Sequence, residues 1–341
     1  PDGITTGALG NIQTSGGRTF DATATYRYNA TVNQTTGNAL PATITGTLFI
    51  DNNGAVGANT TTLTTNNTTV TTFRLNKGLF AAGTGQQINI ASSGTVYGQG
   101  GNQAQTAAAG NINFTGPGTI SPGTGVTLHN VRLNSGGVSG VNMGGGNTTI
   151  TGTLELASGG FVAAGTAPTY SSSPASTLQY NCSCNYGVYE EWYANTYGTS
   201  PGVPHHVTIA AGSSLNFGSN NTPHEMRGDL SISSTSTFAL STVANGNLYI
   251  KGNWTRAAGG TFTHNNRLVR FNGTSGNQTI TVTGGGTETF AYLAIDKSAG
   301  QILNFAAAPN ATNVTVSGAG GTAFQFYNGD IDLNQNTLLF I

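Results

Sequence analysis

The chain has 341 residues, including 51 glycines, and only 7% of its residues are charged, which gives a formal net charge of -1 at pH 7. A disordered chain of such low hydrophobicity usually carries a high net charge, so this composition favours a folded protein. The near-neutral balance offers no basic stripe for nucleic acid, and no apolar stretch reaches the roughly 20 residues that span a bilayer. We therefore expect no nucleic-acid partner, no membrane span and no cofactor.

Apolar and polar residues alternate with period 2 along the chain, whereas helical periodicity is nearly absent. Threonine is β-branched and suits a pleated sheet, while glycine and asparagine accept the positive φ angles of tight corners. The alternation predicts short strands, in chain order over 44–50, 70–75, 88–90, 126–133, 150–156, 207–209, 215–217, 230–232, 248–250, 268–271, 280–282, 293–295, 314–316, 331–333 and 338–340.

One sequence pattern occurs three times: an aromatic residue at a strand end, then Asn, then a polar stretch and a short aliphatic strand. The three copies and the aliphatic strands that follow them are 25–31 with 48–51, 177–181 with 207–209, and 268–274 with 293–296. From the Asn to the following aliphatic strand the steps are 19, 26 and 21 residues. Self-similarity at this period is typical of stacked repeats, in which each unit buries its apolar face on its neighbours.

Aliphatic markers in the second half of the chain recur in steps of 17 to 24 residues. A step near twenty residues fits one coil of a three-faced β-solenoid, whereas a β-sandwich would show turn signals every 8–12 residues. We therefore predict an all-β fold, a parallel β-helix with coils of about twenty residues, as a single domain over 1–341. Residues 1–40 are expected to form an N-terminal cap or the first coils, and 180–204 one long aromatic loop insertion.

Several segments of the second half share a pattern of Gly, Asn and alternating apolar residues, at 246–255, 260–263, 269–274, 278–280, 290–295 and 328–338. They resemble the β-helical repeats of large secreted surface proteins of Bacteroidetes-type bacteria, most strongly from about Tyr180 to Ile341 and again over 20–51. The resemblance implies a right-handed parallel β-helix carried outside the cell, as part of an adhesin-like or structural protein. Such motifs are specific for the architecture and not for an activity.

The segment 180–204 gathers aromatic rings beside two carboxylates. Its candidate ligand-binding residues are Tyr186, Tyr189, Glu190, Glu191, Trp192 and Tyr193. Aromatic rings beside carboxylates are what a carbohydrate-binding or protein-binding loop offers. The alternative is that the rings cover one open face of the solenoid and the carboxylates are solvated.

Cys182 and Cys184 are the only cysteines, and an extracellular setting would favour a local disulfide between them. Two free thiols in a loop are the other structural alternative. Together with His205 and His206 the cysteines could in principle surround zinc, but Cys-x-Cys is not the usual zinc spacing. We therefore predict no metal site.

Many parallel β-helices cleave polysaccharides, a reaction that needs a carboxylate pair and usually a basic residue. The acidic pairs of this chain are Asp330 with Asp332, and Glu190 with Glu191. Asp330 and Asp332 project to one face of a strand, with no Lys or Arg nearby in sequence. Solvation is the expected role of this pair, and we predict that the protein is not an enzyme.

The last predicted strand ends on Leu338, Leu339, Phe340 and Ile341, with no polar cap after it. Solenoid ends need covering, so we expect either that more protein follows or that another copy docks on these residues. The sequence predicts an extracellular or cell-surface protein with a structural or adhesive function, which associates end to end and contacts a surface glycan or a host or neighbouring cell. A carbohydrate-binding module and a polysaccharide-active enzyme on the same fold are the alternatives.

Overall fold

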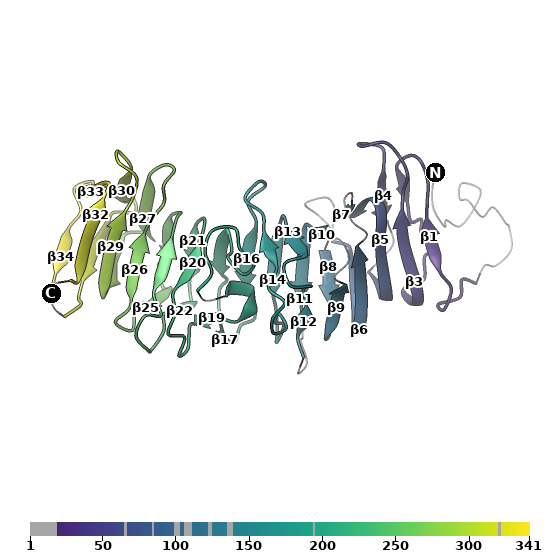
Figure 1. The fold of residues 1–341 in the computed structure, drawn as a ribbon, viewed down its shortest axis with the longest axis horizontal. Helices are drawn as coiled ribbons and strands as arrows, with labels where there is room; N and C mark the ends of the chain where they lie inside the picture. The colour runs from purple at the N-terminus through teal and green to yellow at the C-terminus, as the bar shows by residue number, and fades with distance from the viewer. Residues whose placement is uncertain are drawn as a thin grey trace. The chain divides into compact units, whose positions relative to one another are not determined.

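The computed structural model describes residues 19–64, 67–83, 85–98, 103–105, 111–121, 125–134, 139–193, 195–319 and 322–341. The fold over these residues is all-β, and its parallel strands stack into a β-solenoid of about 12 turns, which confirms the predicted fold class (Figure 1). In the described part the only helical element is a 3₁₀ turn, Glu190–Trp192 (η1), and no helix is long and apolar enough to cross a bilayer. Residues 1–18 of the predicted N-terminal cap lie outside the described residues.

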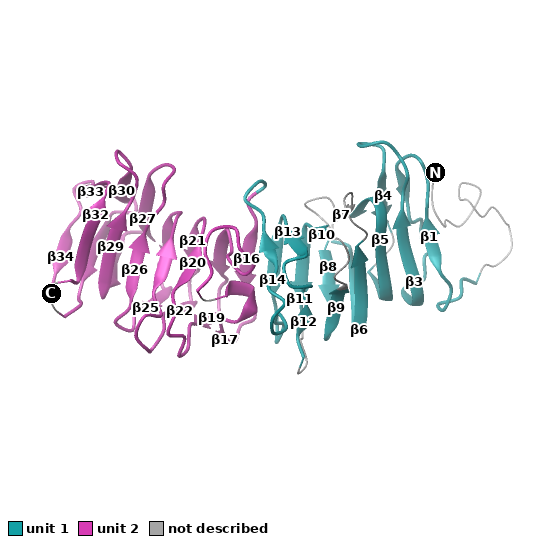
Figure 2. Cartoon of the chain, viewed as in Figure 1, with its two compact units in different colours: residues 1–174 teal, residues 175–341 magenta. Residues whose placement is uncertain are grey.

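The chain divides into two compact units, residues 1–174 and 175–341 (Figure 2). The strands of the first unit are Tyr26–Tyr28 (β1), Gln34–Thr35 (β2), Thr43–Asp51 (β3), Thr60–Leu63 (β4), Thr68–Ala82 (β5), Gln87–Gly98 (β6), Gln103–Gln105 (β7), Asn111–Phe114 (β8), Gly118–Ser121 (β9), Val126–Leu128 (β10), Asn130–Leu133 (β11), Val141–Asn142 (β12), Thr148–Ile150 (β13), Thr153–Leu156 (β14) and Thr169–Tyr170 (β15).

Neighbouring coils of the first unit pair through parallel strands along three rows. The first row passes through the start of β3, β5 and β6 and then through β8, β11 and β14. The second row passes through β1, the later parts of β3, β5 and β6, and then β9 and β12. The third row passes through β2, β4, the end of β5, β7, β10, β13 and β15. Inward side chains such as Ile44, Phe73 and Val96 are fully buried, while the residues between them face outward. The alternation read from the sequence therefore marks the core face of this unit.

Two strands predicted as continuous, 126–133 and 150–156, are each broken by a corner. The first divides at His129 into β10 and β11, and the second divides at Thr151 and Gly152 into β13 and β14. A Cβ atom at Gly152 would lie 2.6 Å from the carbonyl oxygen of His129, so the corner needs a glycine there. Alternating apolar residues continue around such a corner, which is why period 2 alone does not reveal it.

The strands of the second unit are Thr177–Tyr180 (β16), Asn185–Gly187 (β17), His206–Ile209 (β18), Ser214–Asn216 (β19), His224–Met226 (β20), Leu230–Ile232 (β21), Thr237–Ala239 (β22), Leu248–Ile250 (β23), Trp254–Ala257 (β24), Thr261–Thr263 (β25), Leu268–Phe271 (β26), Gln278–Thr283 (β27), Gly286–Phe290 (β28), Tyr292–Asp296 (β29), Ile302–Phe305 (β30), Thr312–Val316 (β31), Phe324–Asn328 (β32), Asp330–Asp332 (β33) and Leu338–Phe340 (β34).

These strands stack in rows that correspond to the faces of the coils (Figure 1). The first row is β16, β18, β21, β24, β27, β30 and β33. The second row is β17, β19, β22 and β25, and the third row is β20, β23, β26, β29 and β32. Strands β28, β31 and β34 form a further row in the later coils.

Each of the three copies of the repeated sequence pattern pairs in parallel with the aliphatic strand that follows it. The registered partners are Tyr26 with Leu48, Leu178 with Val207, and Val269 with Leu293. Some of the other marker steps join different faces. Leu230 pairs with Trp254, whereas Leu248 lies in the third row beside His224. Strands on different faces carry the same aliphatic pattern, so their spacing predicts the coil without identifying the face.

Candidate functional site

The aromatic segment predicted as a loop insertion is shorter than expected, because it contains an ordinary strand. Residues 185–187 form β17 and pair in parallel with β19. Among the described residues that follow β17, none adds a strand to the third row before β20, and residues 188–193 and 195–205, which we call the aromatic loop, take that place. The aromatic loop is therefore a replacement for one strand of a coil.

The aromatic loop lies against β20, the first strand of the third row. The indole Nε1 of Trp192 donates a hydrogen bond of 2.8 Å to the carbonyl oxygen of Glu225, and the Asn195 amide donates one of 2.7 Å to Pro223. The Gly198 amide donates to Oε1 of Glu225 over 2.7 Å. Covering an open strand edge prevents it from pairing with other chains, so these contacts support the covering role considered for the rings.

Trp192 is a core residue, which corrects its prediction as a ligand-binding side chain. It is fully buried, and its ring centroid lies 5.2 Å from that of Phe217 and 6.3 Å from that of Phe238. His224 packs against Trp192 and stacks on Phe217 with 4.1 Å between the ring centroids. The loop is anchored by this aromatic cluster, and Trp192 has no surface to offer a ligand.

Glu191 is also buried and bonded inside the loop. Its Oε1 accepts hydrogen bonds of 3.0 Å from the Tyr180 hydroxyl and 3.0 Å from the Tyr189 amide. Burial raises the pKa of the Glu191 carboxyl to about 7, because desolvation disfavours its charged form. Glu190 and Tyr186 are buried as well. Four of the six predicted ligand-binding residues, including Trp192, are therefore buried.

Tyrosine rings make up the accessible part of the aromatic loop. Tyr189, Tyr193 and Tyr197 are exposed, and Tyr197 stacks on Tyr249 of β23 with 6.3 Å between the ring centroids. Tyr249 lies far from the loop in sequence, so sequence reasoning missed it, although its one-coil separation from Glu225 is the signal that places it in the same row. We call Tyr189, Tyr193 and Tyr197 the tyrosine group, and these exposed rings are the part of the aromatic loop that can contact a partner.

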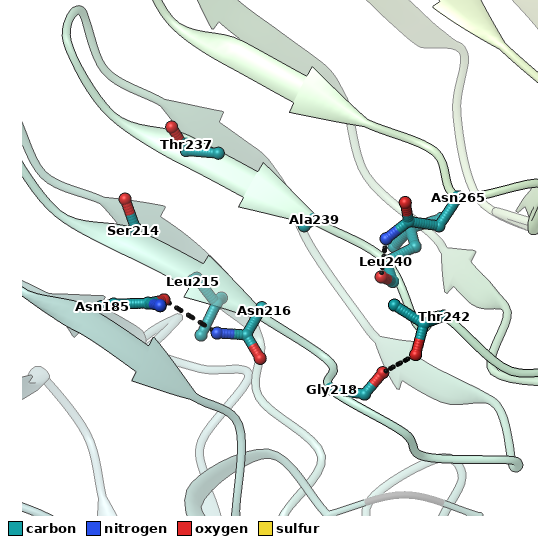
Figure 3. Close-up of a pocket in the computed structure, with 10 residues that line it drawn as sticks. All are labelled: Asn185, Ser214, Leu215, Asn216, Gly218, Thr237, Ala239, Leu240, Thr242 and Asn265. Atoms are coloured by element: carbon teal, nitrogen blue, oxygen red, sulfur yellow. Dashed lines mark hydrogen bonds between the residues drawn. The ribbon is translucent and has the colours of Figure 1, made fainter.

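A shallow pocket of about 510 Å³ lies on the second row (Figure 3). Its lining residues are uncharged, combine hydroxyl and amide side chains with apolar ones such as Leu215 and Leu240, and come mainly from β17, β19 and β22. Asn216 donates through Nδ2 to Oδ1 of Asn185 over 2.9 Å, and Thr242 donates to the Gly218 carbonyl over 3.1 Å. Such a surface can form hydrogen bonds with neutral polar groups, and it holds no group suited to acid–base chemistry at neutral pH.

The two cysteines form a disulfide between Cys182 and Cys184, which leaves no thiol for the zinc alternative. The neighbouring His205 and His206 rings lie edge to face, 4.5 Å apart, and Nδ1 of His206 accepts a bond from the Asp229 amide. Within the described residues no three His, Cys, Asp or Glu side chains are grouped as metal ligands.

The remaining predicted residues lie in the last coil of the second unit. Leu339, Phe340 and Ile341 are exposed and Leu338 is half-buried, and Phe326 and Tyr327 of β32 are exposed as well. Asp330 and Asp332 are exposed on β33, as their expected solvation requires.

Comparison of the chain with protein-family models, with curated proteins and with solved structures found no match. The parallel β-solenoid agrees with the architecture that the resemblance implies. The bacterial group and the adhesin-like type stay predictions.

Proposed function

We propose that this chain is a non-enzymatic, extracellular structural or adhesive surface protein, of the kind that its β-helical repeats resemble. The observation that carries the proposal is the tyrosine group of the aromatic loop, held outward on a loop whose base is fixed by a buried indole. Rigid aromatic side chains lose little conformational entropy on binding and are enriched among the residues that dominate interfaces. The disulfide supports an oxidising compartment outside the cytosol.

Self-association through the last coil is the structural half of the proposal. Strand β34 has one neighbour among the described strands, β31, and its side chains Leu339 and Phe340 are about half exposed. A partly apolar strand edge can be extended by another parallel strand. A second copy of the chain would offer such strands.

Electron microscopy of the purified chain at rising concentration tests this association. Filaments are expected for the unchanged chain, and the Phe340→Asp variant is expected to give isolated particles, since a charge at the contact would have to be desolvated. Thr263→Asp, on the outward face of β25, serves as a control for added charge. Isolated particles at every concentration would contradict end-to-end assembly.

Adhesion through the tyrosine group is tested separately. Tyr189→Ala combined with Tyr193→Ala removes two exposed rings without entering the core. Binding of the chain to an immobilised oligosaccharide panel is expected to fall at least tenfold in this double variant, or about 1.4 kcal/mol. Equal binding by the double variant and the unchanged chain would exclude the tyrosine group as the adhesive surface.

The neutral pocket on the second row favours a carbohydrate-binding module as the second candidate function. Asn216→Ala removes the amide that spans two coils at the pocket. Loss of binding to a neutral glycan in this variant, with binding retained in the tyrosine double variant, would favour the pocket over the loop.

A further inference from the structure

An arginine between two aromatic rings lies on the outer face of the first unit. The guanidinium carbon of Arg74 lies 4.1 Å from the ring centroid of Tyr97 and 5.5 Å from that of Phe49. The three residues are in register on β3, β5 and β6, with Phe49 opposite Arg74 and Arg74 opposite Tyr97. Each is half-buried, so the stack is fixed in place and still reaches solvent.

The charge of Arg74 is not neutralised by a described residue. Five other described cations face a carboxylate, namely Arg27, Arg132, Lys251, Arg256 and Arg270. Arg74 has ring contacts only, with no hydrogen-bond acceptor or acid within reach in the described part of the chain. A guanidinium has five N–H donors in a planar fork that matches a carboxylate, and stacking on rings holds that fork still.

Threonine hydroxyls run beside this stack. Two residues earlier on the same strands, Thr47, Thr72 and Thr95 are in register, and Thr119 of β9 continues the line. All four are half-buried. Because strands lie about 4.8 Å apart, the two rings that flank Arg74 are separated by about 10 Å along the row. The surface therefore offers ring faces, hydroxyls and one unpaired planar cation in a line.

We propose that Arg74, with Phe49 and Tyr97, binds a carboxylate of a uronate-containing polysaccharide on the outer face of β3, β5 and β6. The carboxylate accepts the guanidinium fork, the rings pack against sugar faces, and the threonine line accepts and donates hydrogen bonds to sugar hydroxyls. An acidic peptide would use the cation but would leave the hydroxyl line without regular partners, which favours the polysaccharide. This site is separate from the aromatic loop and does not rest on the proposed function.

The chain contains a matched control for the guanidinium stack. In the second unit Arg270 lies 5.6 Å from the ring centroid of Tyr249 and 5.2 Å from that of Tyr327, so it is stacked as Arg74 is. Arg270 forms an ion pair with Asp296, which neutralises it. A role of stacked arginines in stability alone predicts similar behaviour for the two residues, whereas a binding role predicts that only Arg74 matters.

Affinity electrophoresis of the full chain through gels that contain polygalacturonate, dextran or poly-glutamate tests the proposal. We expect retardation by polygalacturonate only. Arg74→Gln is expected to weaken this binding at least tenfold. Arg74→Lys should weaken it too, because an ammonium group cannot form the paired hydrogen bonds of the fork. Arg270→Gln should bind as the unchanged chain does.

Circular dichroism of each variant confirms that the fold is retained, and Arg74→Lys keeps the charge and stem if Arg74→Gln does not fold. The proposal is overturned if polygalacturonate does not retard the chain, if Arg74→Gln and Arg270→Gln bind equally, or if dextran or poly-glutamate binds as tightly as polygalacturonate.

Discussion

At the scale of single residues, two buried titratable groups act on stability in opposite directions. Burial raises the pKa of Glu191 to about 7 and lowers the pKa of His224 to about 3. Between about pH 4.5 and 6.5 the folded chain holds an extra proton on Glu191, and the unfolded chain holds an extra proton on its histidine. The two contributions to the pH dependence of unfolding therefore cancel in this range.

Replacing Glu191 by Gln removes the contribution of the Glu191 carboxyl to the pH dependence of stability. The raised pKa means that stability from the protonated carboxyl is present below about pH 4.5 and is lost as the pH rises through about 7. The difference in unfolding free energy between Glu191→Gln and the unchanged chain is expected to shift by about 3 kcal/mol in favour of the variant from pH 4.5 to pH 8. Urea unfolding at both pH values measures it, and a constant difference would contradict the protonated state.

Replacing His224 by Phe removes the contribution of the His224 imidazole to the pH dependence of stability. The lowered pKa means that the unchanged chain loses stability as the pH falls from about 6.5 towards 3, by about 5 kcal/mol in total. Phe keeps the stacking on Phe217 and cannot be protonated. The variant should gain relative to the unchanged chain on acidification, as measured by urea unfolding at pH 6.5, 5.5 and 4.5. Parallel stability curves would show that His224 does not titrate on unfolding.

At the scale of elements, the disulfide and its surroundings hold the start of β17. The bridge spans only one intervening residue, and the amides of Cys182 and Ser183 both donate to the buried hydroxyl oxygen of Ser213, over 3.1 and 3.3 Å. So short a loop restricts the unfolded chain little. The Ser213 hydroxyl accepts from both amides, and the amide of the buried Cys182 would otherwise lack a partner.

Reduction of the disulfide is therefore expected to lower stability by only about 1.5 kcal/mol and to leave the fold intact. Ser213→Ala should cost as much or more, about 1–3 kcal/mol, because it leaves two amides without their acceptor. Thermal unfolding with and without a reductant, beside the Ser213→Ala variant, compares the two. Unfolding of the second unit on reduction alone would mean that the bridge and not Ser213 holds this turn.

The sequence predicts the coils better than it predicts the loop. Coil pairing follows from local alternation and spacing, and the partners Val269 and Leu293 follow directly from the repeated sequence pattern and the strand after it. The aromatic loop is different, because Trp192 and Tyr193 are adjacent in sequence and yet one is buried and the other exposed. That difference is decided by contacts with Phe217 and Phe238, more than twenty residues away, which no local pattern contains. Arg74 was missed for a similar reason, since its partners are one coil away on each side.

At the scale of the whole molecule, each coil packs mainly on the coil before and the coil after it. In the second unit Phe238 contacts Phe217 of the previous coil and Phe262 of the next, with ring centroids 5.3 and 5.8 Å apart. Stability in such a stack is close to a sum of neighbour terms. A local defect is thus expected to stay local.

Phe238→Ala tests this behaviour. Loss of a fully buried phenyl ring costs about 3–5 kcal/mol. Hydrogen exchange measured by mass spectrometry should accelerate in β19, β22 and β25 and change little in β31 and β34. Uniform acceleration across the second unit would show a single cooperative core instead.

Because neighbouring coils are in register, the second unit can change its length by whole coils. Leu178 pairs with Val207, and Val207 pairs with Leu230. Deleting residues 207–229 would bring Leu230 to the position beside Leu178 with its inward side unchanged. In evolutionary terms, recombination between repeats can shorten or extend such a protein by whole coils, a route that is closed to a globular domain in which every element packs on several others.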